Sequence, residues 1–148
     1  MLRLNTQKYQ LLELIGISGE FPADQLNRLF YSPSYAEKVI TELKTDKMIR
    51  THYRDKLRGY RLTKRAKEML LHQNPLRFQC FLTGSTETNH IRSEVSRRLR
   101  LHQKAQLYLT LSHVKLPFYY DEKPQIFSIQ QGKYYYAVSP LLLFIQGD

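Results

Sequence analysis

Closely spaced helix start and stop signals divide the first 74 residues into short elements. A first helix is predicted from Thr6 to about Ile17, because Asn5 or Thr6 can cap its start and Gly16 and Gly19 bracket its end. Apolar residues recur between these signals at helical spacing. The pattern therefore predicts a helix with one side buried in a core.

A second and a third helix are expected directly afterwards, with a tight connection between them. Phe21-Pro22 is expected to open the short second helix, and Ser32-Pro33 repeats the start signal for a third helix that runs to about Asp46. Helical spacing gives this third helix a core side made of Ala36, Val39, Ile40 and Leu43. The opposite side carries small hydroxyl-bearing and basic residues, which suit a major groove: Ser34, Lys38, Thr41 and Thr45.

A basic hairpin and a fourth helix complete the N-terminal half. Residues 48–53 alternate as a strand does, residues 54–59 form a polar connection, and residues 60–62 read as the returning strand. Arg54, Lys56 and Arg58 are expected to project to one side of an extended loop. Thr63 is expected to cap the fourth helix, which runs to about His72.

Positive charge concentrates on this hairpin. The chain has a net charge of +10 and a pI of about 9.8, and the stretch from Lys44 to Lys67 holds ten basic and two acidic residues, a net of +8. A basic stretch next to a helix-turn-helix favours nucleic acid as the partner. We expect double-stranded DNA to be bound by eight residues: Ser34, Lys38, Thr41, Thr45, Arg54, Lys56, Arg58 and Arg61.

The sequence predicts an α+β fold, with an N-terminal winged helix-turn-helix domain over residues 1–74 and a small α/β C-terminal region over residues 89–148. Residues 75–88 are expected to be a linker. A helix is predicted over 89–103, with Ile91, Val95 and Leu99 as its apolar stripe, followed by strands over 106–114, 124–130 and 133–138, with Gly132 in a turn. This region also contains Tyr119, Tyr120, Tyr134 and Tyr136, and we expect it to pack on the first domain or to form a homodimer.

The N-terminal half resembles the replication-relaxation family of plasmid and conjugative-element proteins. The matching features are the first helix with Leu11-Leu12, the segments 24–26 and 28–30, Ser32-Pro33-Ser34 with Ala36, and the hairpin that ends in residues 60–63 with 64–66 after it. A later His with a helix after it, over residues 90–101, is also similar. The resemblance implies a winged-helix DNA-binding module of a mobile element, acting in plasmid replication or relaxation or in transcriptional regulation. It implies no proven catalytic activity.

Two other functions fit the same pattern. Winged helices also serve as protein-interaction modules without DNA binding, and a nuclease or relaxase subunit is a third interpretation. The catalytic interpretation has little support, because Asp121-Glu122-Lys123 lacks the spacing of a nuclease site and the five histidines lack ligand spacing. We therefore expect no enzyme activity, no catalytic residues, no metal and no cofactor.

The remaining expectations concern the environment of the chain. No apolar stretch approaches the roughly 20 residues that cross a bilayer, so we expect a cytoplasmic protein with no membrane partner. Cys80 is the only cysteine and is expected to be a small buried apolar residue.

Overall fold

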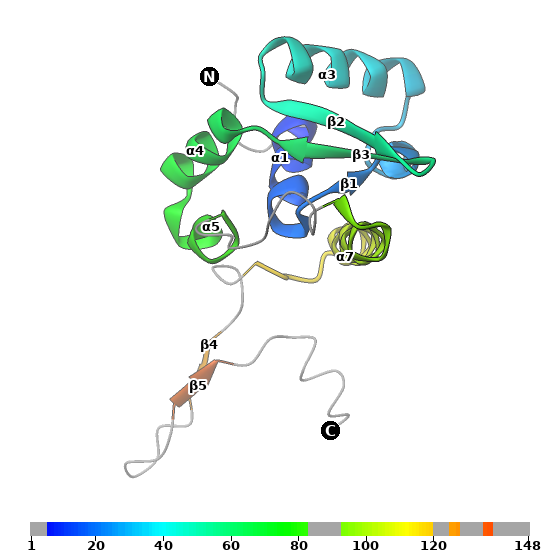
Figure 1. The fold of residues 1–148 in the computed structure, drawn as a ribbon. Coiled ribbons are helices and arrows are strands. Elements are labelled where there is room, and N and C mark those ends of the chain that lie inside the picture. The colour runs from blue at the N-terminus through cyan, green and yellow to red at the C-terminus, as the bar shows by residue number, and fades with distance from the viewer. Residues whose placement is uncertain (1–5, 83–92, 120–124, 128–134, 138–148) are drawn as a thin grey trace. The chain divides into compact units, whose positions relative to one another are not determined.

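The chain forms an α+β fold with a small antiparallel sheet (Figure 1). The computed structural model describes residues 6–82, 93–119, 125–127 and 135–137. The chain divides into two compact units, Met1–Leu109 and Thr110–Asp148. The first unit therefore extends well beyond the boundary at residue 74 that the sequence suggested.

Helix α1 (Gln7–Ser18) is the central helix of the first unit. The Tyr9 N–H donates to the Thr6 hydroxyl oxygen at 3.1 Å, and Gly19 ends the helix with a φ of 90°, which favours glycine. Leu12 and Ile15 are fully buried, as are Leu11 and Leu14. Every residue from Leu11 to Ser18 is buried, as in a helix at the centre of a core. The predicted caps are therefore confirmed, but the helix is buried on more than the one side that was expected.

The second predicted helix starts later than expected, because Phe21–Pro22 forms a short strand, β1. This strand pairs antiparallel with the hairpin, with Phe21 opposite Tyr60 and Pro22 opposite Gly59. The chain becomes helical only afterwards, in η1 (Ala23–Gln25) and α2 (Leu26–Leu29). Pro22 is tolerated because β1 is an edge strand of the sheet order β1-β3-β2.

The third helix and the hairpin follow the sequence prediction closely. Helix α3 (Pro33–Thr45) is capped by Ser32, and it leads to β2 (Ile49–Arg54) and β3 (Leu57–Leu62). Successive residues of a strand point to opposite faces. Lys44 of α3 lies 5.7 Å from the Tyr60 ring centroid, which places α3 against one face of β3.

The predicted linker begins with a helix instead. Helix α4 (Lys64–Gln73), capped by Thr63 as predicted, is followed at once by α5 (Pro75–Leu82), which contacts α1 and α4. Asn74-Pro75 ends one helix and starts the next, because the Asn74 side chain accepts from the Arg77 N–H at 3.1 Å. Phe78 is fully buried, so α5 is part of the core, whereas Cys80 is exposed and not buried as expected.

Helix α7 (Val95–His113) replaces two predicted elements. It includes residues 106–113 of the strand predicted over 106–114, and its expected apolar stripe was wrong, because Val95 and Leu99 are 37% and 46% exposed. Ile91 lies outside the described residues. The buried face of α7 instead carries Arg98, His102, Ala105 and Leu109. Two polar side chains are buried here because they have ionic partners, which are described below.

In the second unit, β4 (Gln125–Phe127) pairs antiparallel with β5 (Tyr135–Ala137). The two strands lie within the segments 124–130 and 133–138 where strands were predicted, while Gly132, Tyr120 and Tyr134 lie outside the described residues. Tyr119 is buried. None of the helices that the structure describes is long and apolar enough to span a membrane.

The packing of α5 gives a test of the boundary of the first unit. Phe78→Ala is expected to lower the free energy of unfolding by about 3–5 kcal/mol, because it leaves a cavity in the core. Leu76→Ala on the same helix removes a side chain that is 63% exposed and should change it by less than about 1 kcal/mol. Urea titrations of both variants make the comparison, and equal effects would mean that residues 75–82 are a linker after all.

Candidate nucleic-acid interface

The outward face of α3 presents the predicted residues together. Ser34, Lys38, Thr41 and Thr45 are all exposed, while Ala36, Val39, Ile40 and Leu43 on the other face are buried. The hydroxyls of Thr41 and Thr45 donate to backbone carbonyls one turn earlier, at 2.9 Å each. Their oxygens keep acceptor capacity toward solvent. The face is therefore polar and accessible, and its side chains other than Lys38 are short.

One of the two acidic residues of α3 is neutralised by a neighbouring helix. Lys8 of α1 donates to the Glu42 carboxylate at 2.5 Å. This hydrogen bond and the charge of Lys8 lower the pKa of the Glu42 carboxyl. Glu42 therefore repels an approaching phosphate less than an unpaired carboxylate would, whereas Glu37 remains exposed beside Lys38.

Sequence reasoning missed an exposed aromatic pair at the start of α3. Tyr31 is 90% exposed and stacks on Tyr35 at 6.4 Å between ring centroids, and Tyr35 also forms a T-shaped pair with Phe30 at 5.6 Å between ring centroids. A large residue just before a helix cap usually packs against the first turns of the helix. Tyr31 contacts the helix through Tyr35, and most of its surface is open to a partner.

The hairpin tip differs from the extended loop that was expected. Strands β2 and β3 continue to Arg54 and Leu57, so only Asp55 and Lys56 form the turn, and both have a positive φ, of 54° and 61°. Arg58 pairs with Tyr53, and its guanidinium lies 5.1 Å from the centroid of that ring. Cross-strand partners share a face of the sheet, so Arg58 points to the same face as Tyr53. Arg54 is the next residue after Tyr53 and therefore points to the opposite face. The expected same-side projection of the three cations is therefore wrong, although all three are exposed at the tip.

A buried carboxylate lies on the other face of the hairpin. The Glu20 side chain is fully buried and contacts Arg61 of β3 and both Arg98 and His102 of α7. The Arg61 Nε donates to the Glu20 Oε1 at 2.6 Å, and the Arg98 Nε donates to both carboxylate oxygens at 3.1–3.2 Å. Burial alone would raise the pKa of Glu20, but hydrogen bonds from His102, Arg98 and Arg61 outweigh it and lower the pKa to about 2.

Arg98 also holds the backbone of the hairpin. Its terminal nitrogens donate to the carbonyl oxygens of Arg54, His52 and Leu57 at 2.9–3.1 Å. One buried guanidinium therefore joins α7 to both strands next to the tip. Because the Arg98 Nε is bound to Glu20, the directions of its other N–H donors are fixed, and these donors hold the backbone of the hairpin in place.

Gly59 allows the Glu20 side chain to pack closely against the backbone of β3. A Cβ at residue 59 would lie 2.6 Å from the Glu20 carboxyl carbon, a distance that real side chains do not reach. Glu20 approaches β3 at Gly59 and α3 approaches it at the next residue, Tyr60. The carboxylate and α3 therefore lie on opposite faces of β3.

Of the eight predicted contact residues, Arg61 alone is removed from the surface. Its side chain is 12% exposed and paired with Glu20, on the face of the hairpin away from α3. No local sequence pattern indicates this pairing, because Glu20 and Arg61 are 41 positions apart. The other seven residues form two exposed groups, the outer face of α3 and the hairpin tip.

The described residues contain no group of three His, Cys, Asp or Glu side chains arranged to hold a metal ion. No family model, curated protein or solved structure matches the chain. The resemblance to the replication-relaxation family therefore remains a prediction from the sequence.

The Glu20 cluster predicts a loss of stability in acid. A carboxyl with a folded pKa of about 2 and an ordinary value of 4.5 stabilises the fold above about pH 4.5, and this contribution is lost as the pH falls toward 2. We expect wild-type protein to lose on the order of 3 kcal/mol across this range from Glu20 alone. Urea titrations between about pH 5 and pH 2 measure the effect.

Two variants distinguish the contribution of Glu20 to this acid dependence from that of the other carboxyls. Glu20→Gln should be less stable at neutral pH, because it leaves Arg98 buried without a countercharge, and should show a shallower dependence on acid. Asp24→Asn removes a carboxylate outside the Glu20 cluster and is the matched control, with the wild-type dependence retained. The same acid dependence in Glu20→Gln and wild-type protein would contradict the assignment.

Proposed function

We propose that the first unit is a winged helix-turn-helix module that binds double-stranded DNA, with α3 in the major groove and the β2–β3 hairpin as the wing. The observation that carries the proposal is the exposed face of Ser34, Lys38, Thr41 and Thr45 on a helix whose other face is buried. Small hydroxyl-bearing side chains allow close approach to base edges, and Lys38 supplies a cation.

The topology supports this proposal. Residues 30–32 connect α2 to α3 as the turn of a helix-turn-helix, and the hairpin follows α3 directly. Strand β1 joins that hairpin to give the order β1-β3-β2. A hairpin placed directly after a helix-turn-helix can reach the DNA backbone beside the groove that α3 occupies.

The electrostatics of the hairpin fit the same function. Arg54, Lys56 and Arg58 are exposed at the tip, and the acid between them, Asp55, lies 3.7 Å from the Arg54 Nε. An exposed pair of that kind is weak and exchanges readily for a phosphate. Because Arg54 and Arg58 point to opposite faces, the tip can contact phosphates on either side of itself.

The biological role that we infer is DNA binding by a mobile-element protein, in replication or relaxation of a plasmid or in transcriptional regulation. This step rests on the sequence resemblance, and self-association to read two half-sites would complement it. A second candidate is a protein-docking module, which the exposed stacked pair Tyr31 and Tyr35 favours. Aromatic side chains of this kind are common at protein interfaces.

A salt titration tests the role of the wing. Arg54→Ala with Lys56→Ala should weaken binding to any duplex and flatten the plot of log affinity against log salt by roughly two units, one for each phosphate that the variant no longer neutralises. Arg100→Ala with Lys104→Ala removes the same charge from α7 and is the control, expected to keep the wild-type slope. Fluorescence anisotropy with a labelled random-sequence duplex at several salt concentrations gives both slopes.

Two results would contradict the wing. Equal slopes for the two double variants would mean that DNA affinity depends on the net charge of the protein and not on the wing. Absence of duplex binding by wild-type protein at low salt would exclude DNA binding and favour the docking module.

A selection experiment tests α3. Thr41→Ala removes an exposed hydroxyl, so it should change the sequences enriched from a random duplex library while shifting the melting temperature little. Glu68→Ala, on the exposed face of α4, is the control and should enrich the wild-type sequences. If Thr41→Ala also enriches the wild-type sequences, Thr41 does not face the bases.

A further inference from the structure

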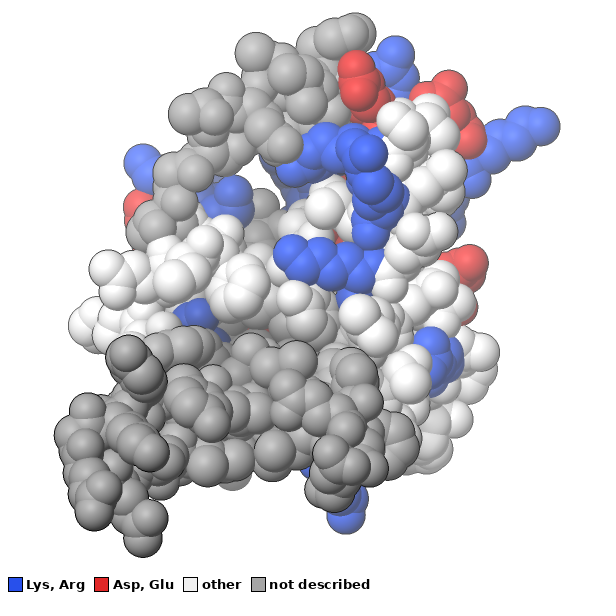
Figure 2. Space-filling view, turned by 90° about the horizontal axis from the view of Figure 1, so that it is seen from below, with Lys and Arg blue, Asp and Glu red and all other residues white. Residues whose placement is uncertain are grey.

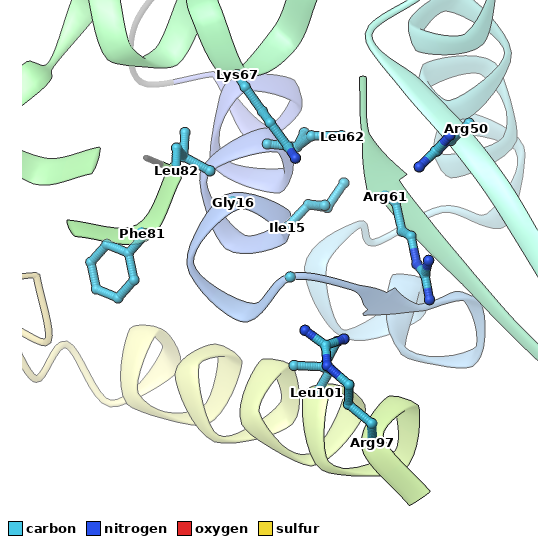
Figure 3. A pocket seen from close by; sticks show the side chains of 11 residues that line it. Ile15, Gly16, Arg50, Arg61, Leu62, Lys67, Phe81, Leu82, Arg97 and Leu101 are labelled. Carbon is cyan, nitrogen blue, oxygen red and sulfur yellow. The ribbon is translucent and has the colours of Figure 1, made fainter. Parts of the chain in front are cut away.

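A cavity lies beneath the hairpin, on the face away from α3. It has a volume of about 140 Å³ and is lined by parts of α1, β2, β3, α4, α5 and α7 (Figure 3). Its walls are held in place by α7, since the Leu101 side chain reaches within 3.3 Å of where a Cβ on Gly19 would lie. Arg98 and His102, close to Leu101 in the sequence, bind Glu20 from the same helix.

Four cationic side chains border the cavity. Arg50 and Arg61 come from the hairpin, Lys67 from α4 and Arg97 from α7. In Figure 3, Lys67 reaches toward the centre from above and Arg97 from below, while Arg61 and Arg50 lie to the right along the strands. No Asp or Glu is among the described residues that line it. The face seen from below in Figure 2 also carries a cluster of Lys and Arg side chains.

Two of these cations stand next to each other on the sheet. Arg50 and Arg61 are direct cross-strand neighbours, a position in which like charges destabilise a sheet. Glu20 offsets the charge of Arg61. Arg50 is exposed, and its side chain makes no hydrogen bond or ion pair with the residues that the structure describes. An anion beside Arg50 and Arg61 would reduce the repulsion between these two side chains.

The rest of the cavity is apolar. Ile15, Leu62, Phe81 and Leu101 line it beside the cations. Phe81 is 40% exposed, although Lys104 lies 5.9 Å from its ring centroid. A cavity with an apolar wall and a few convergent polar groups is the usual form of a small-molecule site. A free phosphate or the DNA backbone would use the cations and leave this wall without a role.

We propose that this cavity binds a small organic anion, with one carboxylate or phosphate group held by Arg50, Arg61, Lys67 and Arg97 and an apolar body against Leu62, Phe81 and Leu101. A cavity of about 150 Å³ accommodates a benzene ring, so the body has about six carbon atoms. The ligand lies on the opposite face of the hairpin from α3, and its site is independent of the DNA contacts of that helix.

The test uses the full-length protein and four probes of related structure. Hexanoate and hexyl phosphate carry both parts of the proposed ligand, 1-hexanol carries only the apolar chain, and inorganic phosphate only the anion. Isothermal titration calorimetry should show binding of at least one of the first two, in the millimolar range or tighter. The other two should bind at least about tenfold more weakly, and the preferred probe shows which anionic group the site takes.

A matched pair of variants locates the binding. Arg97→Gln should weaken binding of the preferred probe by about tenfold or more, because it removes one charge-assisted hydrogen bond. Arg100→Gln removes the same charge from an exposed position of α7 and should bind like wild-type protein. Circular dichroism establishes that both variants are folded before they are compared.

Three outcomes would overturn the proposal: no binding of hexanoate or hexyl phosphate, equal binding of inorganic phosphate and hexyl phosphate, or equal effects of Arg97→Gln and Arg100→Gln. The second would show adventitious anion binding. The titrations contain no DNA, so failure of the DNA-binding proposal leaves these results unchanged, and the reverse also holds.

Discussion

The first unit depends on one buried carboxylate. Glu20 follows α1, lies under β3 and meets Arg61, Arg98 and His102 from two other elements. An unpaired charge in this position would cost several kcal/mol, and removing either arginine would leave the carboxylate without enough partners. Glu20 therefore fixes the position of α7, whose Arg98 and His102 bind it. The wall of the cavity that α7 forms and the support that Arg98 gives to the hairpin depend on Glu20 in the same way.

The two faces of the hairpin have different chemistry because side chains alternate along a strand. On one face Tyr60 lies under Lys44 of α3, and the polar outer surface of that helix is accessible. On the other face Gly59 makes room for Glu20, and Arg50 and Arg61 stand next to each other. A single pair of strands thus separates the outer face of α3 from the proposed anion site.

The sequence predicted what local signals determine. Ser32 caps α3 through its own side chain, and helical spacing alone fixes which residues of that helix face outward, so most of the candidate interface was predictable. Phe21 was assigned to a helix because a two-residue strand is visible only through its pairing partner in β3. The buried face of α7 was missed because a stripe rule favours apolar residues, whereas Arg98 is buried through Glu20, 78 positions earlier. A long separation in sequence also hid the pairing of Arg61.

The separation between Glu20 and α7 also bears on the order of folding. The β2–β3 hairpin closes through a turn at Asp55 and Lys56, so its contacts are local, whereas Glu20 and Arg98 must meet across most of the first unit. Contacts between distant residues form late, and a chain emerging from the ribosome exposes its N-terminal segments first. We expect Glu20 to stay hydrated until α7 has been synthesised and docks. Removal of water from a single carboxylate then marks the completion of the unit, and a nascent chain that stalls before residue 98 keeps its hairpin unsupported.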